Sequence, residues 1–141
     1  MNPLIYSPLI LITVACLMHF YKGLYFIPIE IRAIEEAGQV LNLVAPPHSL
    51  VIGCHGSSPA QVYYCNRKGW TFDLNARDQN LIDRLESLES KGAAYFVTAS
   101  LDRLHRAAGF EEYLRRHRTV LKETDRYVIF KLQERYKVSF F

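Results

Sequence analysis

The sequence predicts an α/β protein: an N-terminal transmembrane helix followed by a small α/β domain with a mixed sheet that ends in a β-hairpin. Three observations predict this class: an uncharged apolar run at the N-terminus, short apolar strands between amphipathic helices, and an alternating pattern around a late polar turn. With 141 residues, the chain is long enough for one modest domain. Its formal net charge of +3 is too small to indicate nucleic acid as a partner.

The first predicted element is a transmembrane helix over residues 1–22. No Asp, Glu, Lys or Arg occurs before Lys22, and the run Leu4–Phe20 is almost wholly apolar. A bilayer core of about 30 Å needs roughly 20 helical residues, which this run and its flanks supply. A cleaved signal peptide is the poorer explanation, since neither a basic start nor a small-residue cleavage site is evident. A buried soluble helix and a lipid-modified Cys16 are two further explanations of the same run.

Residues 23–47 are predicted to form an amphipathic connector helix that ends at the Pro46–Pro47 pair. The other face of this helix is acidic, so packing on the domain is favoured over lying on a membrane surface. Its apolar residues at helical spacing are Ile31, Ile34, Ala37, Leu41 and Val44.

The small soluble α/β domain is predicted over residues 48–141. A short apolar strand, Ser49–Gly53, comes first. A helix follows, with Ser58 as its N-cap, Pro59 at its first position and Gln61 completing a capping box.

The clearest helix is predicted over residues 77–92, with Gly92 at its C-terminal cap. A buried strand over Ala93–Thr98 follows it. Ser100 can cap a further helix, which Gly109 interrupts. The last element is a β-hairpin over residues 119–132, so the order of elements predicts parallel strands first and an antiparallel pair last. The apolar stripe of the clearest helix consists of Leu81, Ile82, Leu85 and Leu88.

The loop "GCHGSSP", residues 53–59, joins a strand to a helix start and is one candidate site. Ligands in open α/β sheets favour the carboxyl ends of strands, and free backbone N–H groups attract anions. Gly56, Ser57 and Ser58 are therefore candidate contacts for a phosphate or carboxylate. The structural alternative is a tight turn before a capped helix.

The stretch "YYCNRKGWTFD", residues 63–73, offers a second candidate, in which Arg67 and Trp70 contact a sugar or a carrier phosphate. The structural alternative is a helix end, with Gly69 in a left-handed C′ position and Trp70 packed back on the last turn. In that alternative, Arg67 and Lys68 suit the negative end of the helix dipole.

The remaining polar residues indicate little chemistry. His48, Cys54, His55 and Cys65 lack the spacing of strong zinc sites, so no metal is predicted. Cys54 and Cys65 are expected to be buried thiols, with a disulfide as the alternative. The basic cluster at 114–118 suits either lipid phosphates or the end of a helix. No catalytic set and no cofactor are predicted.

Three segments in this order, "SPAQVYYCNRKGW", "LIDRLESLESKGAAYFVTAS" and "YVIFKL", follow an apolar helix and a short strand. This arrangement resembles the C-terminal tail of polytopic glycosyltransferases of the dolichyl-phosphate-mannose protein mannosyltransferase superfamily, including aminoarabinose-transferase-like members. The resemblance implies a polyprenyl-phosphate sugar donor and catalytic acids in an early loop that has no counterpart here. It therefore implies that the chain is a fragment or a separately encoded tail, with no catalytic residue to carry over.

The expected function is thus a membrane-anchored, non-catalytic domain of a glycosyltransferase-like membrane protein. Its expected partners are the lipid bilayer, the membrane part of such an enzyme and a polyprenyl-phosphate carrier. Lys22 and Arg32 favour a cytoplasmic domain, but the resemblance implies an extracytoplasmic one, which we adopt. The alternative function is a stand-alone single-pass protein whose α/β domain binds a partner or a small anion.

Overall fold

The computed structural model describes residues 3–25, 29–74 and 80–132, and in the first helix it describes side chains for residues 10–21. The described residues form an α/β fold with a mixed five-stranded sheet, as predicted. The helices are α1 (Pro3–Tyr25), α2 (Ile29–Val44), α3 (Ala60–Tyr64), α4 (Leu81–Ser90), α5 (Leu101–Arg106) and α6 (Ala108–His117). The strands are β1 (Leu50–Cys54), β2 (Gly69–Thr71), β3 (Ala93–Thr98), β4 (Thr119–Glu123) and β5 (Val128–Lys131).

The strands lie in the order β2-β1-β3-β5-β4. Strand β1 pairs in parallel with β2 and with β3, whereas β5 pairs antiparallel with both β3 and β4. Parallel strands therefore occupy one half of the sheet and the C-terminal hairpin occupies the other. This division is the one that the order of elements predicts.

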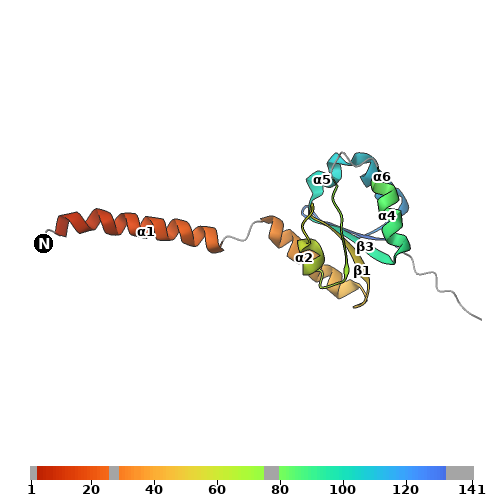
Figure 1. Ribbon diagram of the computed structural model, residues 1–141, viewed down its shortest axis with the longest axis horizontal. Helices are drawn as coiled ribbons and strands as arrows, with labels where there is room; N and C mark the ends of the chain where they lie inside the picture. Colours follow the sequence, from red (N-terminus) through yellow and green to blue (C-terminus); the bar gives the residue numbers. More distant parts are fainter. Residues whose placement is uncertain (1–2, 26–28, 75–79, 133–141) are drawn as a thin grey trace, which may run out of the picture.

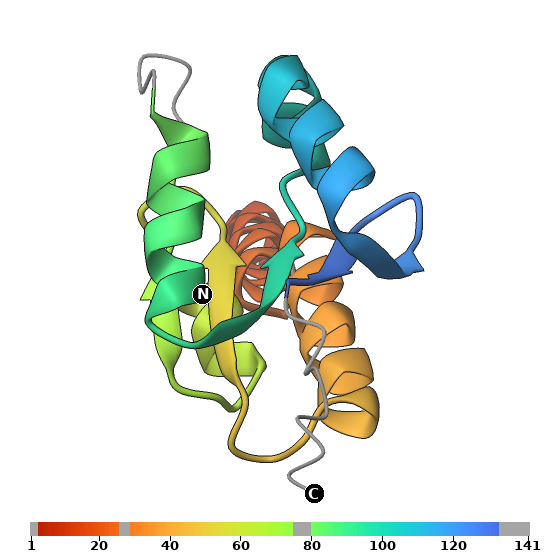
Figure 2. The same cartoon turned by 90° about the vertical axis from the view of Figure 1, so that its right-hand side faces the viewer.

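Helices cover both faces of the sheet (Figure 2). Because successive side chains of a strand point to opposite faces, Val51 packs toward α2 and α3 while Ile52 packs toward α4, α5 and α6. Two apolar cores result, one on each side of the sheet. Burial on both faces also explains why β1 and β3 are almost continuously apolar in sequence.

Helix α2 packs on the domain, as expected for the connector. Its buried side chains include Ala33, Ile34, Ala37 and Leu41, which lie on one side of the helix. The buried amide of Gln61 in α3 donates to the Ile34 carbonyl oxygen at 3.4 Å, which ties the two helices together. The predicted stripe was wrong at its two ends, because Ile31 and Val44 are exposed.

The segment after α3 corrects the predicted helix end. The helix stops at Tyr64, and the residue with the left-handed backbone is Asn66, at φ 48°. Gly69 instead begins strand β2, opposite Val51 of β1. A side chain at Gly69 would collide with the Val51 carbonyl oxygen, so the glycine serves close strand pairing and not a helix cap.

The second half of the domain follows the prediction closely. Strand β3 has the predicted bounds, and Gly92 adopts φ 100° after α4, as a glycine C-cap does. Helices α5 and α6 separate at Ala107, so the interruption precedes Gly109, which lies inside α6.

Helix α1 extends away from the sheet and the other helices (Figure 1). Its described side chains, residues 10–21, are all exposed, with Leu11 at 68% and Phe20 at 73%. Within the parts of the chain that the structure describes, no helix combines the length and apolar character that crossing a membrane requires.

Ion pairs fasten the hairpin to the helix before it. The Arg115 guanidinium in α6 donates to the Glu123 carboxylate in β4 at 2.6 and 3.1 Å, and to Glu111 at 2.8 Å. The hydrogen bond from Arg115 holds the pKa of Glu123 below its ordinary value of 4.5. A carboxylate with a lowered pKa stabilises the fold above its unfolded-state pKa, and this contribution is lost as the pH falls through the folded value.

We therefore expect the free energy of unfolding to fall on acidification below about pH 4.5. The Glu123→Gln variant should show a shallower fall, since glutamine has no proton to take up. Urea unfolding between pH 3 and pH 7 measures this. Glu112→Gln is the matched control, because its ion pair with Arg116 is exposed at both ends. Parallel pH curves for the parent and Glu123→Gln would contradict the assignment.

Candidate functional site

The strongest candidate site lies where the parallel strands end. Strands β2, β1 and β3 point the same way, so the segments after Thr71, Cys54 and Thr98 meet at one edge of the sheet. The chain leaves β1 for α3 on one face and leaves β3 for α5 on the other. Open α/β sheets bind ligands at the point where the connections of two neighbouring strands leave to opposite faces of the sheet.

A cavity of about 400 Å³ opens at this edge. Its walls come from the first turns of α2, the loop after β1, the loop after β3 with α5, and the hairpin turn. Such a volume lies within the range for small-molecule sites. The lining residues that carry polar or charged side chains are Glu30, His55, Ser100, Asp102, Arg103, Arg106, Asp125 and Arg126.

A hydrogen bond joins the ends of the two central strands. His55 Nδ1 and Ser100 Oγ lie 3.2 Å apart, and both groups are partly buried. Thr98 supports this arrangement, because its Oγ1 donates to the Cys54 carbonyl oxygen at 3.0 Å and accepts from the Ser100 N–H at 3.1 Å. These bonds fix the position of the loop after β1 relative to the loop after β3, beside the cavity.

Gly56 lies directly against Arg103. It has φ 59°, and a Cβ there would come within 2.5 Å of Arg103 Nη1. The absence of a side chain leaves space for the guanidinium at the cavity edge. The carboxylate of Asp73, after β2, lies 3.9 Å from the same nitrogen. Gly56 is thus a predicted site residue that lies beside a cation.

The two serines of the same loop have other positions. Ser58 Oγ accepts a hydrogen bond from the Ala60 N–H at 3.3 Å, so it serves the start of α3. Ser57 is exposed, and neither serine lines the cavity. The expected capping box is wrong, because α3 begins at Ala60 with Pro59 as its N-cap residue in place of Ser58, and the Gln61 amide is buried against α2.

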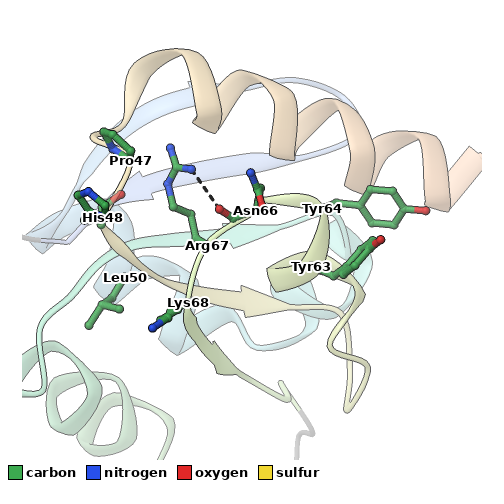
Figure 3. A pocket seen from close by; sticks show the side chains of 9 residues that line it. Pro47, His48, Leu50, Tyr63, Tyr64, Asn66, Arg67 and Lys68 are labelled. Atoms are coloured by element: carbon green, nitrogen blue, oxygen red, sulfur yellow. Dashed lines mark hydrogen bonds between the residues drawn. The ribbon is translucent and has the colours of Figure 1, made fainter.

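Arg67 lines a separate cavity of about 900 Å³ at the opposite edge of the sheet, shown in Figure 3. Its Nη2 donates to the Ala45 carbonyl oxygen at 3.2 Å, just after α2 ends. Lys68 points the other way in Figure 3, and Tyr63 is exposed. The Nη1 of Arg67 donates to the Asn66 carbonyl oxygen at 3.2 Å, so the guanidinium bridges the end of α2 and the turn that follows its own helix, α3.

Trp70 belongs to neither cavity. It lies opposite Ile52 in the sheet and packs, partly buried, against the core beneath α4. Arg67 and Trp70 therefore point into different environments and do not form one binding site. Their side chains hold the sheet to its helices on opposite faces.

The two cysteines of the domain have structural roles. Cys54 and Cys65 are free, buried thiols, which rules out a disulfide between them. Burial raises the pKa of each thiol to about 11, which makes both poor nucleophiles. Among the residues described, no group of three or more His, Cys, Asp or Glu side chains is placed to hold a metal ion.

The basic cluster is paired with acids. Arg116 binds Glu112 in the same helix at 2.8 Å. Arg118 binds Glu89 at the end of α4 through two hydrogen bonds of 2.7 Å. These pairs, together with those of Arg115, favour a structural role for this cluster over a lipid-phosphate site.

The sequence did not single out Arg103 and Arg106, and it identified Ser100 only as a helix cap. The sequence did contain a signal for Ser100. This residue follows a buried strand that was expected to lie parallel to the strand before the loop at residues 53–59, and the carboxyl ends of parallel strands lie together. Comparison with protein-family models, with curated proteins and with solved structures finds no match for this chain. The chemistry of the site therefore has to be inferred from its own geometry.

Proposed function

We propose that this chain is a membrane-anchored, non-catalytic α/β domain of a glycosyltransferase-like membrane protein, with the exposed apolar side chains of α1 covered by lipid. One observation carries the proposal: the described side chains of α1 are mostly apolar, and all are exposed. Covering such a surface with lipid is favourable, because it removes the apolar side chains from water. The family resemblance supports the glycosyltransferase context and the extracytoplasmic placement of the domain.

The non-catalytic part of the proposal follows from the family resemblance, which implies catalytic acids in an early loop that has no counterpart in this chain. The purified chain should transfer no sugar from polyprenyl-phosphate donors, and robust transfer by this chain alone would overturn the proposal.

Cys16 provides a direct test of insertion. It is the exposed cysteine on α1, whereas Cys54 and Cys65 are buried with raised pKa values. In reconstituted vesicles, Cys16 should resist a water-soluble maleimide and should react once detergent and denaturant are added. Ser87→Cys, on the exposed side of α4, is the control. It should react in vesicles that have been made permeable, so that the maleimide reaches both faces of the membrane. Equal labelling rates at the two positions would refute insertion of α1.

The second candidate function is that of a stand-alone anchored domain that binds a partner or a small anion. The cavity at the carboxyl edge of the parallel strands favours it, because two arginines, a histidine and a serine line one wall. The two functions differ in whether the chain acts without a larger membrane enzyme. Co-purification of the tagged chain with a polytopic membrane protein would support the first function.

A further inference from the structure

We infer that the cavity at the carboxyl edge binds a small phosphate ester, with the phosphate group held by His55, Ser100, Arg103 and Arg106. This inference deepens the small-anion function and does not depend on whether α1 enters a membrane. It rests on how the charges of the cavity are distributed and on which of them are already paired.

The two cations of α5 lie on the same side of the helix. Arg103 and Arg106 are three residues apart, and such residues are neighbours on a helix surface. Arg106 uses its Nε to donate to the Asp102 carbonyl oxygen at 3.1 Å. Among the described residues, its terminal amino groups have no acceptor within hydrogen-bond distance. Arg103 has the long 3.9 Å contact with Asp73.

Arg126, the third cation of the cavity, is already paired. Its Nη1 donates to the Glu36 carboxylate at 2.9 Å, and its Nε lies 3.8 Å from the Asp125 carboxylate. It is therefore not counted among the phosphate ligands. The wall formed by α5 offers the terminal amino groups of Arg106 and those of Arg103, whose contact with Asp73 is longer than a hydrogen bond, and His55 and Ser100 add polar groups beside them.

The opposite wall is acidic. Glu30 in the first turn of α2 and Asp125 in the hairpin turn line the cavity there, and Asp102 adds a carboxylate from α5 itself. These acids would repel a ligand that is anionic throughout. A phosphate ester that also carries hydroxyl or ammonium donors satisfies both walls, because the donors can meet the carboxylates while the phosphate meets the arginines. Bidentate arginine contacts suit phosphate in particular.

The position of the cavity bears on the source of the ligand. Glu30 and Ala33 belong to the start of α2, which is the part of the domain that follows α1 in the chain. A phosphate ester could therefore reach the site as a free small molecule or as the headgroup of a lipid. The chemistry of recognition is the same for both sources.

The test uses the full chain in detergent, titrated by calorimetry with inorganic phosphate and with O-phosphoethanolamine. We expect O-phosphoethanolamine to bind more tightly, and we expect Arg103→Gln with Arg106→Gln to weaken its binding by at least about tenfold. Arg116→Gln, in an exposed pair on α6, is the matched control and should leave binding unchanged. Equal melting temperatures without ligand would show that the double variant folds.

Failure of both probes to bind at millimolar concentration would overturn the inference, as would equal binding by the parent and the double variant. A second arm distinguishes the sources in lipid nanodiscs. If a headgroup occupies the site, discs that contain phosphatidylethanolamine should bind O-phosphoethanolamine more weakly than phosphatidylcholine discs do. Equal affinity in both discs would assign the site to a free ligand. The calorimetric titration in detergent needs no bilayer. A negative result there would therefore contradict phosphate-ester binding without bearing on the proposal that α1 is a membrane anchor.

Discussion

Replacing Phe96 with alanine is expected to lower the free energy of unfolding by about 3–5 kcal/mol, the range for deleting a buried aromatic ring. Phe96 is fully buried in β3 at the middle of the sheet. Its ring lies 5.7 Å from that of Phe72, 5.9 Å from that of Phe110 and 6.3 Å from that of Phe130, measured between centroids. Removing it takes one partner from each of these edge-on contacts and leaves a cavity.

Urea unfolding, followed by circular dichroism, measures this loss. Tyr63→Ala is the control, because that ring is 78% exposed on α3 and surface substitutions usually change stability by about 0.5 kcal/mol or less. A loss of less than about 1 kcal/mol in Phe96→Ala would mean that the core between the sheet and α4–α6 is not packed as described. The total free energy of unfolding of a small domain is only about 5–15 kcal/mol, so the expected loss is a large share of it.

Gly38→Ala should cost about 2 kcal/mol or more, although alanine is the better helix former by up to about 1 kcal/mol. Gly38 lies in α2 where this helix crosses the end of α3. A Cβ at this position would meet the backbone of Tyr64 and Cys65, with the Tyr64 carbonyl oxygen nearest. Backbone atoms cannot swing aside as a side chain can, so the two helices would have to move apart.

Gly109→Ala is the matched control for this substitution. It makes the same exchange inside a helix, α6, but a Cβ there would meet nothing within 4 Å. The melting temperature should therefore stay level or rise for Gly109→Ala and fall by several degrees for Gly38→Ala. If both variants were stabilised, the close contact between α2 and α3 would be refuted.

The sequence predicts most of the fold because its local signals agree with the tertiary packing. The apolar stripe of α4, the glycine after it and the run of β3 all appear at their predicted places. Strand β2 was missed because it has only three residues and owes its conformation to pairing with β1. The same pairing explains the glycine at 69, whose reason lies in a neighbour distant in sequence.

The candidate site was predictable only in part. The glycine loop after the first strand was located correctly at the carboxyl edge of the sheet, and Gly56 contacts a cation there. Arg103 and Arg106 could not be assigned, because only the strand order brings α5 beside that loop. Arg67 and Trp70 are close in sequence, but they face opposite sides of the sheet and so do not act together.

The two outer strands of the sheet also bear on how this molecule behaves among its own copies. Strand β2 is only three residues long, and β4 carries Lys122 and Glu123, with a register irregularity after Val120. Edge strands that are short, charged or irregular are poor templates for the addition of a strand from another chain. The domain should therefore resist edge-to-edge aggregation even when many copies are crowded together.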